Sequence, residues 1–219
     1  MRDLYLNTVS NNLAEVLNQL MRMEEFNPFR LVGGTALCLQ LGHRISIDID
    51  LFTDVDYDSI DFTSIDNLLG KTFPFTEMLY LGNNSFGKSY YIGNSRNEAV
   101  KLDLFYTDSF IRPMVEKDFV RMASIEEISA MKMEIIGNGG RKKDFWDIHE
   151  LLDYLSLEQM LDLHAERYPY GHSKELLTNK LVDFQFADDD LSPICLKGKY
   201  WELIKEDFHE MIQISKISK

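Results

Sequence analysis

The chain has 219 residues, of which 45% are hydrophobic and 27% are charged, and these globular values exclude a disordered, collagen-like or coiled-coil protein. Its formal net charge of −13 argues against a protein that coats nucleic acid through a broad basic surface. No apolar run approaches the roughly 20 residues of a membrane helix. The first ten residues also lack the basic start and apolar stretch of a signal peptide, so we expect a cytoplasmic protein without a membrane partner.

The first part of the chain alternates between helical and extended patterns. Apolar residues at helical spacing predict an opening amphipathic helix, and two further helices follow, so that helices are expected over 6–20, 35–41 and 63–71. Runs bounded by glycine and asparagine predict strands over 29–32, 46–52, 76–81, 89–92 and 99–106. Turn residues at 82–84 and 93–95 separate the later strands, which predicts an antiparallel or mixed sheet.

After about residue 123 the pattern becomes helical. Ser156-Leu-Glu-Gln159 has the spacing of a capping box, which marks the start of a helix. The apolar periodicity predicts helices over 125–137, 143–155, 157–167, 172–184 and 200–215. We therefore expect an α+β protein with two domains, an α+β domain over residues 1–123 and a helical domain over residues 124–219.

Carboxylates occupy one side of the strand expected over 46–52. Asp48 and Asp50 leave the same face about 7 Å apart, while Ile47, Ile49 and Leu51 leave the other face. Residues 100–104 alternate in the same way and bring Asp103. If the two strands are neighbours, the three carboxylates share a surface on which a divalent cation can bind. The alternative is an exposed strand whose polar face is acidic without any ligand.

The pair Gly33-Gly34 lies between an expected strand and an expected helix. Glycines at such a position let backbone N–H groups approach a phosphate, and the positive end of the helix dipole favours the anion. The alternative is a tight turn that binds nothing. The position just before the acidic strand favours the phosphate interpretation.

These segments together resemble a known family. The family is that of the AbiEii/AbiGii-type nucleotidyltransferase-like toxins, which belong to the polymerase-β-like nucleotidyltransferase superfamily. Its first motif is resembled by three segments of this chain, Leu31-Val-Gly-Gly-Thr-Ala-Leu37, Gly42-His-Arg-Ile-Ser46 and Asp48-Ile-Asp-Leu-Phe52. Lys101-Leu-Asp103 resembles the second motif, which brings the third carboxylate. Lys132 and Asp144 resemble the two later motifs.

The resemblance implies a nucleotidyltransferase-type mixed twisted sheet with flanking helices, followed by a helical C-terminal region. It also implies transfer of a nucleoside monophosphate from a nucleoside triphosphate, with Mg²⁺ or Mn²⁺, to an acceptor. The implied acceptor is RNA, notably the tRNA 3′ end, and the implied setting is a toxin–antitoxin or phage-defence pair with a cognate antitoxin protein.

On the same resemblance, the residues fall into two groups. The catalytic and metal-binding residues are Asp48, Asp50 and Asp103. The nucleotide-binding residues are Gly33, Gly34, Thr35, Arg44, Ser46, Lys132 and Asp144.

Other interpretations of these residues remain open at this point. Arg44 can neutralise Asp48 instead of contacting a triphosphate, Lys132 can extend from an apolar helix face to solvent, and Asp144 can complement a helix dipole. The acceptor can be a small cationic molecule, as in aminoglycoside-modifying relatives, because the chain is acidic. A non-catalytic nucleotide-binding or interaction module is the third alternative.

Overall fold

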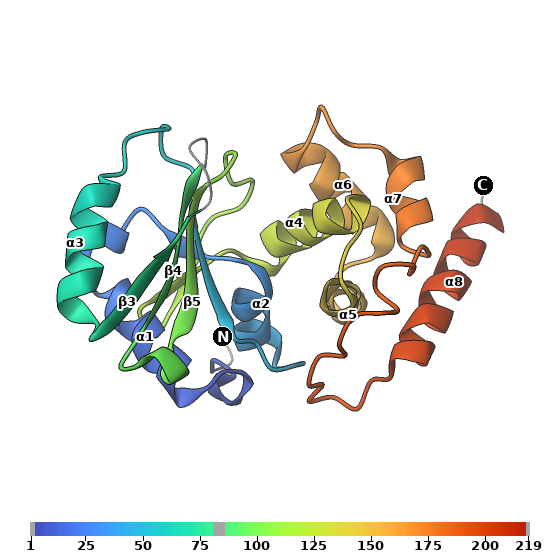
Figure 1. Ribbon diagram of the computed structural model, residues 1–219. Helices are drawn as coiled ribbons and strands as arrows, with labels where there is room; N and C mark the ends of the chain where they lie inside the picture. The colour runs from blue at the N-terminus through green and yellow to red at the C-terminus, as the bar shows by residue number, and fades with distance from the viewer. Residues whose placement is uncertain (1–2, 81–85, 218–219) are drawn as a thin grey trace. The chain divides into compact units, whose positions relative to one another are not determined.

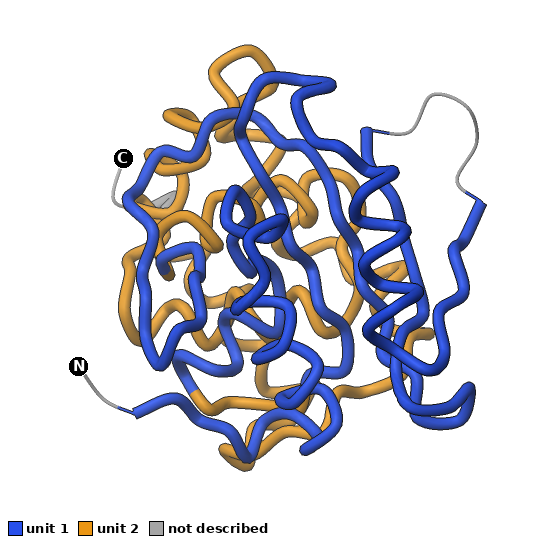
Figure 2. Tube along the Cα trace, turned by 90° about the vertical axis from the view of Figure 1, so that its left-hand side faces the viewer, with its two compact units in different colours: residues 1–41, 46–124 blue, residues 42–45, 125–219 orange. Residues whose placement is uncertain are grey.

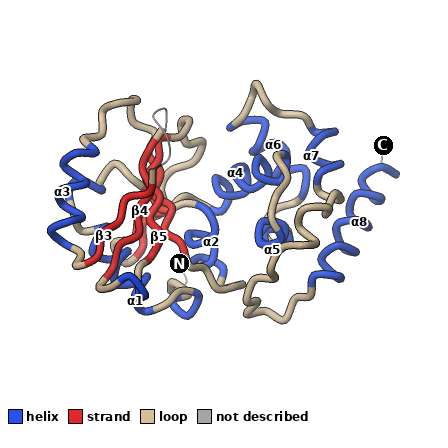
Figure 3. Tube along the Cα trace, viewed as in Figure 1, coloured by secondary structure: helices blue, strands red, loops and turns tan. Residues whose placement is uncertain are grey.

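The computed structural model describes residues 3–80 and 86–217. The chain divides into two compact units, of which the first comprises residues 1–41 and 46–124 and the second comprises residues 42–45 and 125–219 (Figure 2). The strands drawn in Figure 3 all belong to the first unit. The expected turn at 82–84 lies outside the described residues. Among the described residues, no helix combines the length and the apolar composition that crossing a membrane requires.

A seven-stranded sheet forms the first unit, in the order β3-β4-β5-β2-β1-β7-β6. Its strands are β1 (Arg30–Leu31), β2 (Asp48–Thr53), β3 (Phe75–Leu79), β4 (Gly87–Gly93), β5 (Val100–Tyr106), β6 (Val115–Lys117) and β7 (Val120–Met122). The pairs β2/β5 and β1/β7 are parallel and the other four are antiparallel. The predicted mixed sheet is therefore confirmed.

The two faces of the sheet differ in polarity because side chains alternate along each strand. Ile49 and Leu51 of β2 and Leu102 and Leu104 of β5 are fully buried. In Figure 1, α1 (Asn11–Met21) and α3 (Phe62–Thr72) lie on one side of the sheet and α2 (Gly33–Leu41) lies on the other. The acidic residues of β2 and β5 therefore belong to the face from which α2 begins.

Helix α1 begins five residues later than predicted. The side chain of Ser10 caps it by accepting a hydrogen bond of 3.1 Å from the Leu13 N–H, and residues Leu6–Thr8 form a separate short 3-10 helix. Leu6 is 59% exposed, whereas the apolar stripe from Leu13 to Leu20 is buried. Two further 3-10 turns cover Glu24–Phe26 and Arg96–Glu98.

The short strands β6 and β7 were not predicted. Each has three residues, which is too few for an alternating pattern to stand out from the sequence. Asp118 and Phe119 between them have φ angles of 49° and 68°, which produce the reversal of the chain.

The second unit contains α4 (Ile125–Gly137), α5 (Lys142–Leu151), α6 (Leu157–Arg167), α7 (Lys174–Lys180) and α8 (Trp201–Ile217). The predicted helical C-terminal region is therefore confirmed. The capping box at Ser156 and Gln159 is present as predicted. Helix α7 is shorter than expected at both ends, since Ser173 caps its start and the helix ends at Lys180, four residues before the predicted end. A cluster of aromatic rings forms much of the core, namely Phe145, Phe184, Trp201 and Phe208.

Residues 42–45 leave the first unit between α2 and β2 and pack within the second. The Ile45 N–H donates to the Ile194 carbonyl at 2.9 Å, and the Leu196 N–H donates to the His43 carbonyl at 2.8 Å. We propose two domains that divide between residues 123 and 124, except that residues 42–45 belong to the second domain.

Candidate active site

Strands β2 and β5 bring three carboxylates to one face of the sheet. The two strands are parallel neighbours, with Asp48 opposite Lys101 and Asp50 opposite Asp103. Residues opposite each other in a ladder point to the same side of the sheet. All four side chains are half-buried, whereas the residues between them are fully buried. We call Asp48, Asp50, Asp103 and Lys101 the acidic row.

Lys101 supplies the positive charge in the acidic row, on the face that the alternation of residues 100–104 predicts for it together with Asp103. Its ammonium group lies 2.6 Å from Asp103 Oδ2, and the Ser89 hydroxyl donates to Asp103 Oδ1 at 2.5 Å. Partial burial on its own would lower the pKa of Lys101, but the hydrogen bond and charge of Asp103, with the charges of the other two carboxylates, raise that pKa instead. The row therefore contains three carboxylates and one ammonium group.

Gly33 begins α2 directly beside the acidic row. Its φ angle is +66°, and a Cβ at this position would lie 2.8 Å from Asp50 Oδ2. An L side chain at this position would strain the backbone and would require the Asp50 carboxylate to shift. The carboxylate of Asp50 thus lies at the start of α2, where the first N–H groups of the helix have no partner within the helix.

Thr35 and Ser46 hold the start of α2 against the start of β2. Their hydroxyl groups lie 2.8 Å apart, and the Thr35 hydroxyl also donates to the Asp48 carbonyl. Both side chains are buried. The structure therefore gives these two predicted nucleotide-binding residues a contact that fixes the position of Asp48.

The acidic row matches a divalent cation in the chemistry of its donors, because Mg²⁺ and Mn²⁺ prefer carboxylate oxygens. Within residues 3–80 and 86–217, no three His, Cys, Asp or Glu side chains converge closely enough to hold one ion. In the structure, Asp103 contacts Lys101 and Ser89. Asp48, Asp50 and Asp103 are the residues that would hold an ion, and the row has the excess of negative charge that such binding needs.

The second unit contains a different arrangement of charges, which we call the buried network. Its members lie on residues 42–45, α4 and α5, and they are His43, Arg44, Lys132, Asp144 and Asp147. Arg44 binds Asp147 through two nitrogen atoms, Nε at 2.6 Å from Oδ1 and Nη2 at 2.8 Å from Oδ2. Three predicted nucleotide-binding residues, Arg44, Lys132 and Asp144, therefore lie in this network.

Lys132 joins the two carboxylates of the network. Its ammonium group lies 2.6 Å from Asp144 Oδ1 and 2.7 Å from Asp147 Oδ2, and its side chain is 4% exposed. Burial on its own would lower the pKa of Lys132, but Asp147 and Asp144 raise it. Asp144 also accepts a hydrogen bond of 3.1 Å from the Arg141 N–H at the start of α5.

Two members of the network, His43 and Asp147, were left out of the predicted site, and Asp147 is the one that contacts His43, Arg44 and Lys132. Burial on its own would raise its pKa, but the charges of Arg44 and Lys132 and hydrogen bonds from His43 and Arg44 hold the pKa well below its usual range. The sequence signal for it is its spacing of three residues from Asp144, which puts both carboxylates on one face of α5.

Several known proteins are similar to this chain. A family model described as "Nucleotidyl transferase AbiEii toxin, Type IV TA system" matches residues 15–212. An uncharacterized protein from Aquifex aeolicus (strain VF5) is 25% identical over 217 residues, which cover 91% of this chain and 93% of that protein.

Solved structures share the fold. The crystal structure of a putative nucleotidyltransferase from H. pylori matches with a TM-score of 0.57 and 22% identity, over 91% of this chain and 92% of that one. MenT4, a nucleotidyltransferase toxin from Mycobacterium tuberculosis H37Rv, matches with a TM-score of 0.54 and 10% identity, over 90% and 84%. The predicted nucleotidyltransferase fold is thereby confirmed. The family match spans both units, and the chain belongs to the AbiEii nucleotidyltransferase toxin family of type IV toxin–antitoxin systems.

Proposed function

We propose that this protein transfers a nucleoside monophosphate from a nucleoside triphosphate to an RNA acceptor, with the tRNA 3′ end as the expected acceptor and Mg²⁺ or Mn²⁺ as the cofactor. The observation that carries the proposal is the shared face of Asp48, Asp50 and Asp103 beside the start of α2. Carboxylates for a cation and the N–H groups at the start of a helix for a phosphate are the two elements that such a reaction needs.

The carboxylates have distinct roles in this proposal. Asp48 and Asp50 would hold the divalent ion against the triphosphate. When bound, the ion neutralises charge on the attacking and leaving oxygen atoms. Asp103 would accept the proton of the attacking acceptor hydroxyl or serve as a further ligand. The hydroxyl oxygen forms a bond to the α-phosphorus, and pyrophosphate leaves.

The remaining predicted residues divide into those that contact phosphate and those that position it. Backbone N–H groups of Gly33 and Gly34 would bind phosphate oxygens, and Thr35 and Ser46 would keep α2 in place beside Asp48. Direct contact of Arg44, Lys132 and Asp144 with the nucleotide stays a prediction, because in the structure these side chains bind the members of the buried network.

The main test is transfer of label from each of the four α-labelled nucleoside triphosphates to total tRNA in the presence of Mg²⁺. We expect labelled RNA with at least one nucleotide. Label that appears on small molecules alone would select the alternative acceptor class, and no label on any acceptor would contradict the proposed transfer.

Asp48→Asn and Asp50→Asn test the acidic row directly. Each change removes one negative charge from the proposed metal site, and we expect transfer to fall by at least about 10²-fold. Asp162→Asn, at an exposed position of α6, is the matched control and should keep full activity. Growth inhibition on expression should be lost in the same two variants. Inhibition that persists with Asp48→Asn would favour a non-catalytic interaction module.

A further inference from the structure

An aromatic pocket adjoins the acidic row. Its volume is about 560 Å³, within the range of about 300–1,000 Å³ typical of small-ligand sites. Five of its eight lining residues are aromatic, and the full set is Phe52, Val55, Tyr57, Phe86, Phe105, Tyr106, Thr107 and Asp108. All of them belong to the first unit.

The pocket continues the acidic row along the same two strands. Phe52 follows Asp50 by two residues on β2, Phe105 follows Asp103 by two residues on β5, and the two phenylalanines are opposite each other in the ladder. Their side chains therefore leave the same face as the carboxylates, about 7 Å further along the strands. A ribose with its base spans a comparable distance, so a base in the pocket places its sugar at the acidic row.

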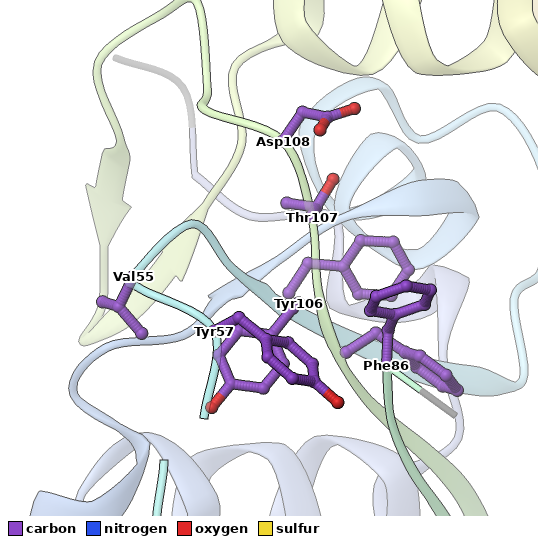
Figure 4. Close-up of a pocket in the computed structure, with 8 residues that line it drawn as sticks. Val55, Tyr57, Phe86, Tyr106, Thr107 and Asp108 are labelled. Atoms are coloured by element: carbon purple, nitrogen blue, oxygen red, sulfur yellow. The ribbon is translucent and has the colours of Figure 1, made fainter. Parts of the chain in front are cut away.

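Part of the pocket is open to solvent. Tyr57 and Phe86 are 64% and 65% exposed, so these rings do not belong to the core. Tyr57 lies 5.6 Å from Phe86 and 5.2 Å from Tyr106 between ring centroids. Figure 4 shows these three rings close together, with Thr107 and Asp108 further along the chain. Exposed rings that converge in this way are a surface on which bases stack.

The charge of the pocket favours a base over a phosphate. Among the described residues that line it, none is Lys or Arg, and its ionisable acid is Asp108. A phosphate group would enter without a cation to bind it. A nucleobase needs no cation, because stacking acts through its neutral face.

The position of the pocket favours the acceptor over the incoming nucleotide. The start of α2 lies beside Asp50 of β2, which assigns the triphosphate to the β2 side of the row. Residues 105–108, which are half of the lining, come from β5 and its continuation, and Phe86 immediately precedes β4. Five of the eight lining residues thus belong to β5 or adjoin β4 and β5, whereas Phe52, Val55 and Tyr57 belong to β2 or follow it, so the larger part of the pocket lies on the β5 side of the row.

We propose that this aromatic pocket binds the 3′-terminal base of a single-stranded RNA acceptor by stacking and so presents its ribose hydroxyl to Asp103. The inference rests on the proposed nucleotidyl transfer to RNA and adds how the acceptor is held. Since recognition through stacking is tolerant of sequence, the pocket would accept any of the four bases.

The test compares binding of two short single-stranded RNAs to the full chain without nucleoside triphosphate. One RNA ends in a normal 3′ nucleotide and the other in an abasic 3′ nucleotide, and fluorescence anisotropy of a 5′ label reports the affinity. The variant Tyr57→Leu with Phe86→Leu removes the two exposed rings. Its matched control, Tyr57→Phe with Phe86→Tyr, keeps both rings.

We expect the leucine variant to bind the normal RNA about 5- to 150-fold more weakly than the wild type, and the aromatic control to bind it like the wild type. With the abasic RNA the difference between wild type and leucine variant should disappear. An equal loss for both RNAs, or no loss for either, would overturn the inference. Retained urea midpoints would show that the leucine variant still folds.

Steady-state kinetics separate this inference from the proposed function. In the leucine variant, KM for the RNA acceptor should rise while KM for the triphosphate stays unchanged. The opposite result would place the incoming base in the pocket and overturn the acceptor assignment. If the wild type transfers label and the leucine variant is unaffected, the pocket inference alone fails. If the wild type transfers no label to RNA, the proposed function fails, whatever the binding result.

Discussion

The acidic row and the buried network both combine carboxylates with cationic side chains, but in different proportions. The row has three carboxylates and one ammonium group, and its members Lys101 and Asp103 are 34% and 16% exposed. The network has two carboxylates beside Arg44 and Lys132, and its side chains are at most 4% exposed. Charges balance where water is excluded and stay unbalanced where water enters. Excess charge at an accessible surface attracts a ligand, whereas balanced charge in the interior stabilises one arrangement of the chain.

The largest effect that this comparison predicts is a loss of stability in Asp147→Asn. The change removes the carboxylate that both Arg44 and Lys132 contact, and breaking a buried ion pair from one side typically costs about 3–5 kcal/mol. Urea denaturation would measure the loss, with Asp162→Asn as the exposed control. A loss of unfolding free energy no larger than that of the control would show that the network does not stabilise the second unit.

Acid should weaken the network in a defined range of pH. In the folded state the pKa of Asp147 is well below its usual value, whereas in the unfolded chain the pKa of an aspartate is about 3.9. The unfolded chain therefore takes up the proton first, so this stabilisation is complete above the unfolded value and is lost as the pH falls toward the folded one.

The free energies of unfolding of the wild type and Asp147→Asn should consequently differ by a constant amount above about pH 5. Below about pH 4 the two free energies should approach each other as the pH falls. Urea midpoints measured across this range would test the expectation. A difference that stays constant into acid would mean that the carboxylate of Asp147 does not carry the effect.

The smallest expected effect concerns the cation affinity of the acidic row. Lys101→Met removes the ammonium group that binds Asp103, so Mn²⁺ should bind more tightly by about fivefold, equivalent to about 1 kcal/mol for a partly exposed pair. Calorimetric titration with Mn²⁺ would measure it. Lys88→Met is the matched control, because Lys88 is 30% exposed and pairs with Asp66 outside the row. Equal or weaker binding in Lys101→Met would show that the ammonium group does not compete with the cation.

Capping residues predicted the start of one helix and were overlooked at another. The capping box at Ser156 placed α6 correctly. Helix α1 was predicted to begin five residues too early because Leu6 continues the apolar spacing, although Ser10 caps the helix after it. The strands β6 and β7 had no such signal, and their pairing depends on the rest of the sheet.

The candidate site was predictable in composition and only partly in arrangement. The two-residue alternation identified the carboxylates of β2 and β5, and the glycine pair identified the start of α2. The contacts of Arg44 were not predictable, because its partner Asp147 lies 103 residues away in the sequence. The role of Lys101 depends likewise on which strand lies beside β5.

The sequence by itself determined the alternation that puts Asp48 and Asp50 on one strand face, because side-chain direction along a strand is a local property. It also indicated the family, since the three segments of the first motif all lie within residues 31–52. The tertiary structure decided that Asp50 is opposite Asp103, that Asp50 fills the space beside Gly33, and that residues 42–45 join the second unit. These are pairings between distant segments, and they depend on which surfaces the whole chain can bury together.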